Sequence, residues 1–251
     1  MIEIRNIKKS FKDKEVLKGV SAVFYQGKTN MIIGASGTGK SVLLKCIVGL
    51  IPPNEGNVLY NDRDFYESGR DTQKQIRREV GMLFQGSALF DSKTVEQNVG
   101  FPLDMLTNMP KSEKADRVHY CLERVGLLGA EKKMPSEISG GMQKRVGIAR
   151  AIVMNSQYLF CDEPNSGLDP QTALMIDNLI QEITHEFNLT TVVVSHDMNS
   201  MLEIGEHIIF LHQGHKVWEG SSDDINQATS QELNEFIFAN KLMRKFKAGE
   251  I

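Results

Sequence analysis

The sequence predicts an α/β fold built around a mainly parallel β-sheet. In the second half of the chain, short apolar runs typical of strands lie at residues 158–161, 191–194 and 208–211. Stretches with the apolar spacing of helices, residues 172–187 and 198–205, separate these runs. Strands that alternate with helices are joined by crossover connections, which place the strands parallel to one another. A chain of 251 residues is long enough to bury the core that such a sheet needs.

The first half of the chain supplies further strands and one helix. Residues 2–4 and 16–24 follow a β-like alternation. Residues 30–33 form a short apolar strand that runs into a glycine-rich loop, and residues 41–50 form an apolar, helix-like segment that ends near two prolines. Two more predicted strands are residues 58–60 and 80–84.

The character of the sequence changes between about residues 95 and 155. Apolar residues there recur at helical spacing, so we expect a mostly helical insert. After residue 230 the apolar positions again follow helical spacing, which predicts a short terminal helix. We expect this helix to cap its own domain, with docking on a neighbouring subunit as the alternative. The predicted organisation is one domain, residues 1–230, followed by a short helical tail, residues 231–251.

Composition and charge narrow the possible functions. A formal net charge of −3 argues against nucleic acid as a partner, because nucleic-acid-binding surfaces are usually basic. The three cysteines, Cys46, Cys121 and Cys161, lie far apart, which disfavours a disulfide framework or a zinc site and favours a reducing compartment. No apolar run approaches the roughly 20 residues that a membrane span needs. We therefore expect any membrane role to come through a partner protein.

A glycine-rich loop after the strand at 30–33 predicts nucleotide binding. It matches the pattern G-x-x-x-x-G-K-[ST] with the residues Gly34, Ala35, Ser36, Gly37, Thr38, Gly39, Lys40 and Ser41. Glycines let the backbone N–H groups wrap closely around phosphate, and the following helix N-terminus adds positive potential. We expect Lys40 to reach the β- and γ-phosphates of ATP and the Ser41 hydroxyl to bind Mg²⁺. Val42 then offers only its backbone N–H, where many such loops carry a second hydroxyl residue.

Two adjacent carboxylates, Asp162 and Glu163, end the apolar strand at 158–161. Neighbouring carboxylates at a strand end are costly unless a cation or a proton compensates them, and Mg²⁺-nucleotide is a natural cation. In that case Asp162 holds the metal and Glu163 acts as the general base toward the attacking water. Taken alone, the pair is equally compatible with a solvated acidic turn.

The order and spacing of six motifs then make a family resemblance plain. Besides the glycine loop and the carboxylate pair, the motifs are Gln85, Ser139-Gly140-Gly141, Ser166-Gly167-Leu168-Asp169 and Ser195-His196-Asp197. Over about residues 1–225 the sequence resembles the nucleotide-binding domain of ABC transporters. The resemblance implies a P-loop NTPase ABC ATPase domain with a mainly parallel core, an antiparallel β subdomain and a helical subdomain inserted at about residues 95–155.

The resemblance also implies roles for single residues within one chain. Phe11 matches the aromatic residue that stacks on adenine, although a core packing role is the alternative. Gln85 matches the residue that contacts Mg²⁺ and the attacking water and senses the membrane partner. His196 matches the histidine that contacts the γ-phosphate, where a merely structural strand-end histidine is the alternative. With Glu163, these residues make up the implied catalytic set.

Other matched residues imply a homodimer. Ser139, Gly140 and Gly141 match the signature loop, which in the family binds the γ-phosphate of ATP held by the other subunit. A serine hydroxyl and glycine N–H groups at a helix start suit an anion. Asp169 matches the loop that contacts the second subunit. At three positions the sequence differs from the residues that are common in the family motifs, and we expect none of these differences to abolish activity: Ile138, Met142 and Asn165.

A second, narrower resemblance concerns the transported substrate. The stretch 82–103, together with the wording around residues 139–146, resembles the ATPases of Mce/Mla-type phospholipid transporters. Those ATPases work with an integral membrane permease and an MCE-domain lipid-binding protein, so the implied location is the cytoplasmic face of the inner membrane. Ala88, Leu89 and Phe90 in this stretch could contact that permease or pack under the helical insert.

Two other functions share the same motor. A small-solute importer would carry the same catalytic residues, although methionine-type importers add a C-terminal regulatory domain where only about twenty residues follow Ser230 here. A soluble ABC ATPase without a permease is the second alternative, although ribosomal ABC proteins usually hold two cassettes and this chain has one.

Overall fold

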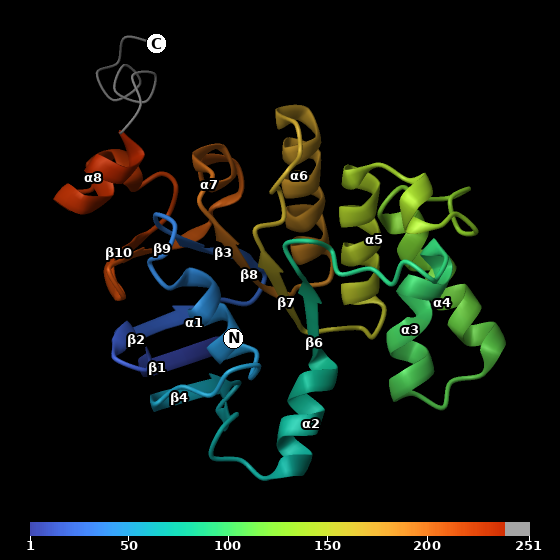
Figure 1. The fold of residues 1–251 in the computed structure, drawn as a ribbon, viewed down its shortest axis with the longest axis horizontal. Coiled ribbons are helices and arrows are strands. Elements are labelled where there is room, and N and C mark those ends of the chain that lie inside the picture. The colour runs from blue at the N-terminus through green and yellow to red at the C-terminus, as the bar shows by residue number, and fades with distance from the viewer. Residues whose placement is uncertain (239–251) are drawn as a thin grey trace.

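A computed structural model of the chain describes residues 1–238 and contains a six-stranded sheet whose order is β10-β9-β3-β8-β7-β6 (Figure 1). The neighbours from β9 to β6 are parallel, and β10 runs antiparallel to β9 at one edge. The parallel core predicted from the alternation of strands and helices is confirmed. The strands are β3 (Lys28–Ile33), β6 (Val80–Leu83), β7 (Tyr158–Asp162), β8 (Thr190–Ser195), β9 (His207–His212) and β10 (His215–Gly220).

A second sheet is antiparallel and has the order β2-β1-β4-β5. It corresponds to the antiparallel subdomain implied by the family resemblance. Its strands are β1 (Ile2–Phe11), β2 (Lys14–Phe24), β4 (Glu55–Tyr60) and β5 (Arg63–Asp64). The sequence analysis did not identify the short strand β5, the edge strand β10 or helix α2 (Arg70–Glu79).

Helices cover the sheets, and three of them pack on one another beyond β6, the last strand of the large sheet (Figure 1). These three lie within the predicted insert: α3 (Val95–Leu106), α4 (Lys111–Arg124) and α5 (Gly140–Ile152). Helix α5 also packs on β6, which ties the helical group to the sheet. The remaining helices are α1 (Lys40–Ile47), α6 (Pro170–Glu186), α7 (Met198–Ile204), α8 (Gln231–Ile237) and the 3₁₀ turns at Pro135–Glu137 and Ile225–Gln227.

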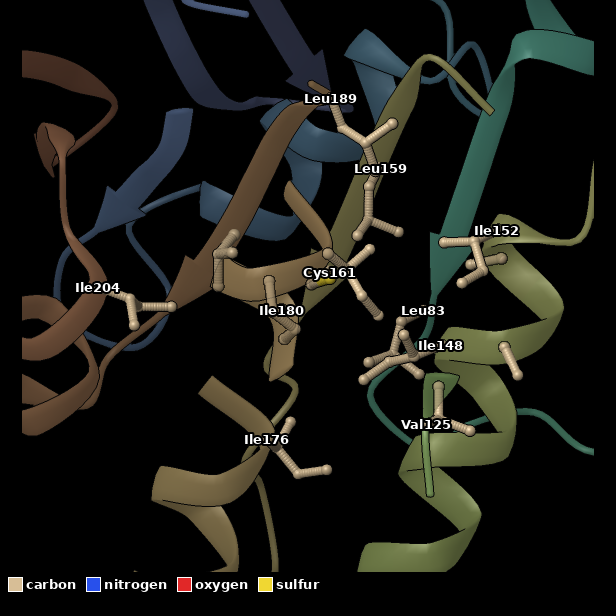
Figure 2. Close-up of a cluster of buried hydrophobic side chains, with 14 of the residues drawn as sticks. Leu83, Val125, Ile148, Ile152, Leu159, Cys161, Ile176, Ile180, Leu189 and Ile204 are labelled. Carbon is tan, nitrogen blue, oxygen red and sulfur yellow. The ribbon is translucent and has the colours of Figure 1, made fainter. Parts of the chain in front are cut away.

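Two hydrophobic cores occupy the two faces of the large sheet. Because successive side chains of a strand point to opposite faces, Val193 of β8 enters one core while Val192 and Val194 enter the other. The first core contains Cys161 and side chains of α5 and α6 (Figure 2). The second core lies between the large sheet and the antiparallel sheet, with α1 inside it. Helix α1, which follows the glycine loop, is thus held from both sides.

The C-terminal helix α8 packs on its own domain, as expected. Leu233 and Ile237 are buried, and the ring of Phe236 lies 5.3 Å from that of Phe210 in β9. The rest of the predicted tail, from residue 239 onward, lies outside the described residues, and the domain boundary at residue 230 stays a prediction. Among residues 1–238, no helix is long and apolar enough to cross a membrane. Cys46, Cys121 and Cys161 are free and buried.

Candidate functional site

The glycine loop, the carboxylate pair, Gln85 and His196 gather at the carboxyl ends of the neighbouring parallel strands β3, β8, β7 and β6. In sheets of this kind, ligands bind outside the carboxyl ends of the strands. The glycine loop leaves β3, Asp162 ends β7, His196 follows β8 and Gln85 follows β6. The strand order β3-β8-β7-β6 therefore brings together residues that are far apart in the chain.

The glycine loop has a backbone that only glycine tolerates at its tightest positions. Gly34 has φ +150°, and an added Cβ would lie 2.3 Å from the Leu211 carbonyl oxygen. Gly39 has φ +106° and lies against Val16 and Leu17 of β2. The exposed rim of the loop is formed by Ala35, Ser36 and Gly37. The loop is therefore fixed at its ends, and its crest is open to a ligand.

Lys40 bridges the loop from beneath. Its Nζ donates hydrogen bonds to the carbonyl oxygens of Gly34, at 2.8 Å, and of Ala35, at 3.0 Å. The residue is only 5% exposed, and this burial lowers the pKa of Lys40, although the nearby carboxylates of Glu163 and Asp162 act in the opposite direction. Among residues 1–238 no carboxylate pairs directly with this buried ammonium group, so it is well placed to attract an anion such as phosphate.

Ser41 and Asp162 form a pair of oxygen ligands beside that ammonium group. The Ser41 hydroxyl donates to Asp162 Oδ1 at 3.0 Å. Burial is the main cause that raises the pKa of Asp162, and the charge of Glu163 raises it further. Mg²⁺ prefers one or two such oxygens together with substrate phosphates, so the chemistry of this pair fits the ion. The described residues contain no cluster of three His, Cys, Asp or Glu side chains that could hold a metal without a substrate.

Glu163 lies between two other predicted residues. Its Oε2 accepts a hydrogen bond from Gln85 Nε2 at 2.9 Å, and its Oε1 lies 3.1 Å from His196 Nδ1. Its backbone has φ +48°, a conformation that costs energy for a non-glycine residue and that often marks functional sites. The Glu163 N–H is bonded to Val194 O at 2.9 Å, which holds this turn on β8. The predicted catalytic residues Gln85 and His196 therefore both contact the Glu163 carboxylate.

Phe11 lies at the end of β1 and is 44% exposed, so it is not the core residue of the alternative interpretation. Its ring carries the Lys9 ammonium group at 5.2 Å from the centroid. An exposed aromatic face is what stacking on a base requires. Val42 is half-buried and packs against the core around α1, so its side chain supports the loop.

The signature loop Ser139, Gly140 and Gly141 begins α5, and the Ser139 hydroxyl accepts a hydrogen bond from Met142 N. A surface pocket of about 440 Å³ is lined by Gly140 together with residues 85–87 and 166–168, and its described lining contains no residue of the glycine loop. Asp169 caps α6, where its carboxylate accepts from Gln171 N, Thr172 N and Thr172 Oγ1, and these bonds lower its pKa. Its predicted contact with a second subunit stays a prediction.

The sequence analysis missed two cations of α5 that hold the loop after β6. Lys144 Nζ donates to the backbone oxygen of Gln85, and Arg150 donates to Ser87 O at 2.5 Å and Ala88 O at 2.8 Å. Both Ser87 and Ala88 have positive φ, so this loop is strained between the two cations. In the sequence these contacts are marked only by the six-residue spacing of Lys144 and Arg150, which does not indicate which atoms accept their hydrogen bonds.

The sequence matches the ABC transporter family over residues 17–166, and the chain belongs to the ATP-binding subunits of that family. The solved dimeric ATP-binding cassette MJ0796, in a post-hydrolysis state with ADP and Pi, is 33% identical with a TM-score of 0.79 and covers 88% of this chain and 99% of that chain. The chain is thus an ATPase of the ABC type that binds and hydrolyses ATP.

Three curated relatives span most of the chain. A probable ribonucleotide transport ATP-binding protein of Mycobacterium leprae is 36% identical over 96% of this chain and 70% of its own length. A methionine import ATP-binding protein of Clostridium acetobutylicum is 38% identical over 94% of this chain and 74% of its own. The chloroplast protein trigalactosyldiacylglycerol 3 of Arabidopsis thaliana is 34% identical over 94% and 73%. The chain is therefore the ATP-binding subunit of a transporter.

We expect Lys40→Ala to weaken ATP binding by at least about tenfold, because one or two charge-assisted hydrogen bonds to phosphate are removed. Equilibrium binding of a fluorescent ATP analogue measures the effect. Lys74→Ala, which removes an exposed lysine of α2, serves as the matched control and should bind normally. Unchanged affinity of the Lys40 variant would exclude Lys40 from the site.

Proposed function

We propose that the chain powers the transport of phospholipid between membranes as an Mla/Mce-type ATPase. The observation that carries this proposal is the likeness to an Arabidopsis protein named for a galactolipid, over 94% of this chain. The amino-acid sequence of residues 82–103, which resembles the corresponding region of lipid-transport ATPases, supports the proposal. A small-solute importer is the second candidate, because a methionine import ATPase is similar at 38% identity.

In this proposal Glu163 is the general base that orients and deprotonates the attacking water. Gln85 and His196, which hold the Glu163 carboxylate from two sides, position that water and the γ-phosphate. Ser41, Gln85 and Asp162 would hold Mg²⁺, and the bound ion would neutralise charge on the phosphates. Lys40 and the loop N–H groups hold the phosphates, and Phe11 stacks on adenine. The chain itself thus supplies positioning and charge stabilisation.

The chain acts as a homodimer in which the signature loop serves the ATP of the partner. This accounts for the separation of Ser139, Gly140 and Gly141 from the glycine loop of the same chain, and the solved cassettes of similar sequence are dimeric. Asp169 lies near the signature loop, because a Cβ added at Gly141 would lie 2.5 Å from Thr172 Cγ2, and the hydroxyl of Thr172 donates to Asp169. Loss of the γ-phosphate removes contacts that join the halves and releases them.

A permease docks in a groove beside the strained loop after β6. The groove encloses about 350 Å³ and has an apolar lining that includes the exposed Phe84, Phe90 and Leu106. Its charged lining residues are three arginines, Arg77, Arg78 and Arg150, with no carboxylate among the described lining residues. Of the two interpretations for residues 88–90, packing fits Leu89, whereas Ala88 and Phe90 are exposed for contact. The groove suits an apolar helix that carries an acidic residue.

We propose the cytoplasmic face of the inner membrane as the location of the chain, where it would act as a peripheral subunit of the transporter. An MCE-domain lipid-binding protein is proposed as a further partner on the far side of the permease. Nucleic acid is not a proposed partner, since the net charge of the chain is −3.

We expect Glu163→Gln to bind ATP with nearly normal affinity while its turnover falls by at least about a hundredfold, because general-base catalysis typically contributes 10²–10⁴-fold. Steady-state phosphate release and size-exclusion chromatography with ATP measure turnover and the accumulation of an ATP-bound dimer. The same substitution at an exposed site outside the proposed site, Glu67→Gln, is the control. Turnover at the wild-type rate in Glu163→Gln would remove the proposed base.

The cargo is tested by expressing the chain with its chromosomal neighbours and purifying the tagged complex in mild detergent. A permease, an MCE-domain protein and bound phospholipid are expected. A permease with a solute-binding protein would overturn the lipid assignment, and the absence of any membrane partner would overturn the transporter docking.

The docking groove is tested in the same purification. Leu106→Glu, which places a carboxylate in the groove, should reduce recovery of the permease about tenfold. The equally exposed Leu128→Glu outside the groove should not.

A further inference from the structure

The side-chain amide of Asn165 fastens two helices to the turn that carries Glu163. Its Nδ2 donates hydrogen bonds to Asp177 Oδ2 of α6, at 2.7 Å, and to Ser200 Oγ of α7, at 2.9 Å. Both acceptor residues are only 2% exposed. One amide group therefore joins three segments, the turn after β7, helix α6 and helix α7, through buried hydrogen bonds.

This cluster is costly for stability alone. A buried carboxylate loses its hydration, and burial raises the pKa of Asp177 to about 6, with Asp197 and Glu203 of α7 adding to the increase. In the described structure, Asp177 Oδ1 and Asn165 Oδ1 have no hydrogen-bond partner. Buried unsatisfied polar atoms are uncommon and call for an explanation, and an apolar replacement of such a group is often stabilising. A role in positioning explains why the polar cluster is present.

The cluster lies close in sequence to two residues of the site. Asn165 is two residues after Glu163 and is held in the same turn, where Ser166 N donates to Glu163 O and Leu168 N donates to Asn165 O. Ser200 lies in the first turns of α7, which begins directly after His196 and Asp197. Glu163 and His196 also meet through their own side chains at 3.1 Å. The turn of Glu163 and the segment of His196 are thus connected by two contacts. One is the side-chain contact of Glu163 with His196 in the site, and the other is the buried hydrogen bond of Asn165 with Ser200.

We propose that Asn165, Asp177 and Ser200 form a positioning cluster that sets the distance between the Glu163 turn and the His196 segment for ATP hydrolysis. The cluster does not touch the substrate, so these three are positioning residues. The inference rests on the proposed roles of Glu163 and His196. According to this proposal, the rate of hydrolysis depends on the cluster outside the site. ATP binding does not, because Lys40 and the glycine loop lie on other elements.

A reciprocal exchange of the two side chains tests the proposal. Asn165→Asp alone sets two carboxylates against each other, and the shift of the turn should lower kcat about tenfold or more, since small misplacements of catalytic groups are costly. Asp177→Asn alone leaves an acceptor for the Asn165 amide and should keep kcat within about threefold. The double exchange restores an amide–carboxylate pair with the same atoms, and kcat should return to within about threefold of the wild type.

The measurements are kcat and KM for ATP with the full-length chain, together with the midpoint of thermal unfolding. Asn108→Asp is the matched control, because it makes the same substitution at an exposed position between α3 and α4, outside the cluster. Its kcat should equal that of the wild type. If Asn165→Asp fails to fold, Ser200→Ala, which removes a single oxygen atom, carries the same criterion of a lower kcat at unchanged KM.

Wild-type kcat in both Asn165→Asp and Ser200→Ala would overturn the proposal. So would a double exchange that recovers thermal stability while kcat stays low, because the amide–carboxylate pair would then be purely structural. Glu163→Gln in the same assay separates this failure from that of the proposed function. If Glu163→Gln is inactive and Asn165→Asp is fully active, only the positioning cluster is wrong. If Glu163→Gln is active, the assignment of the catalytic base is wrong.

Discussion

The parallel pairing of β3, β8 and β7 is the constraint on which the site depends. Parallel neighbours end at the same edge of a sheet, and the register pairs Ile33 with Ser195 and Asp162 with Val194. The glycine loop, the carboxylate pair and the histidine segment must therefore emerge side by side. The two cores on either face of the sheet hold this edge fixed. The site can then gather charges that would be unfavourable without a cationic ligand, and a nucleotide with its metal ion supplies the missing compensation.

In the proposed dimer, each chain contributes one part of each ATP-binding site, and the two parts lie on different structural units of the chain. The glycine loop precedes α1, which packs between the two sheets, whereas the signature loop starts α5 in the helical group. Lys144 and Arg150 of α5 hold the strained loop of Gln85, and Arg150 also lines the proposed permease groove. Motion of a permease in that groove can thus act on Gln85 and on the signature helix together.

Much of this could be predicted from the sequence, because the relevant signals are local. The glycine loop between strand 30–33 and a helix, and the acids that end strand 158–161, are contiguous patterns whose chemistry requires that order. What could not be predicted depends on tertiary contacts. Short elements such as β5 have no periodicity to detect. The acceptor of Lys144 is a backbone oxygen, which no sequence pattern marks. The hydrogen bond of Asn165 to Asp177 joins polar residues of types that usually lie on the surface, and only the fold buries them.

The central claim is that each ATP site is completed by the signature loop of a second copy of the chain. A cysteine pair, Ser36→Cys with Ser139→Cys, tests it in the Glu163→Gln background, since both serines are exposed and the native cysteines are buried. Mild oxidation with ATP should give a covalent dimer on non-reducing gels, and the dimer should be absent without ATP. A disulfide within one chain, or no ATP-dependent dimer, would contradict the account.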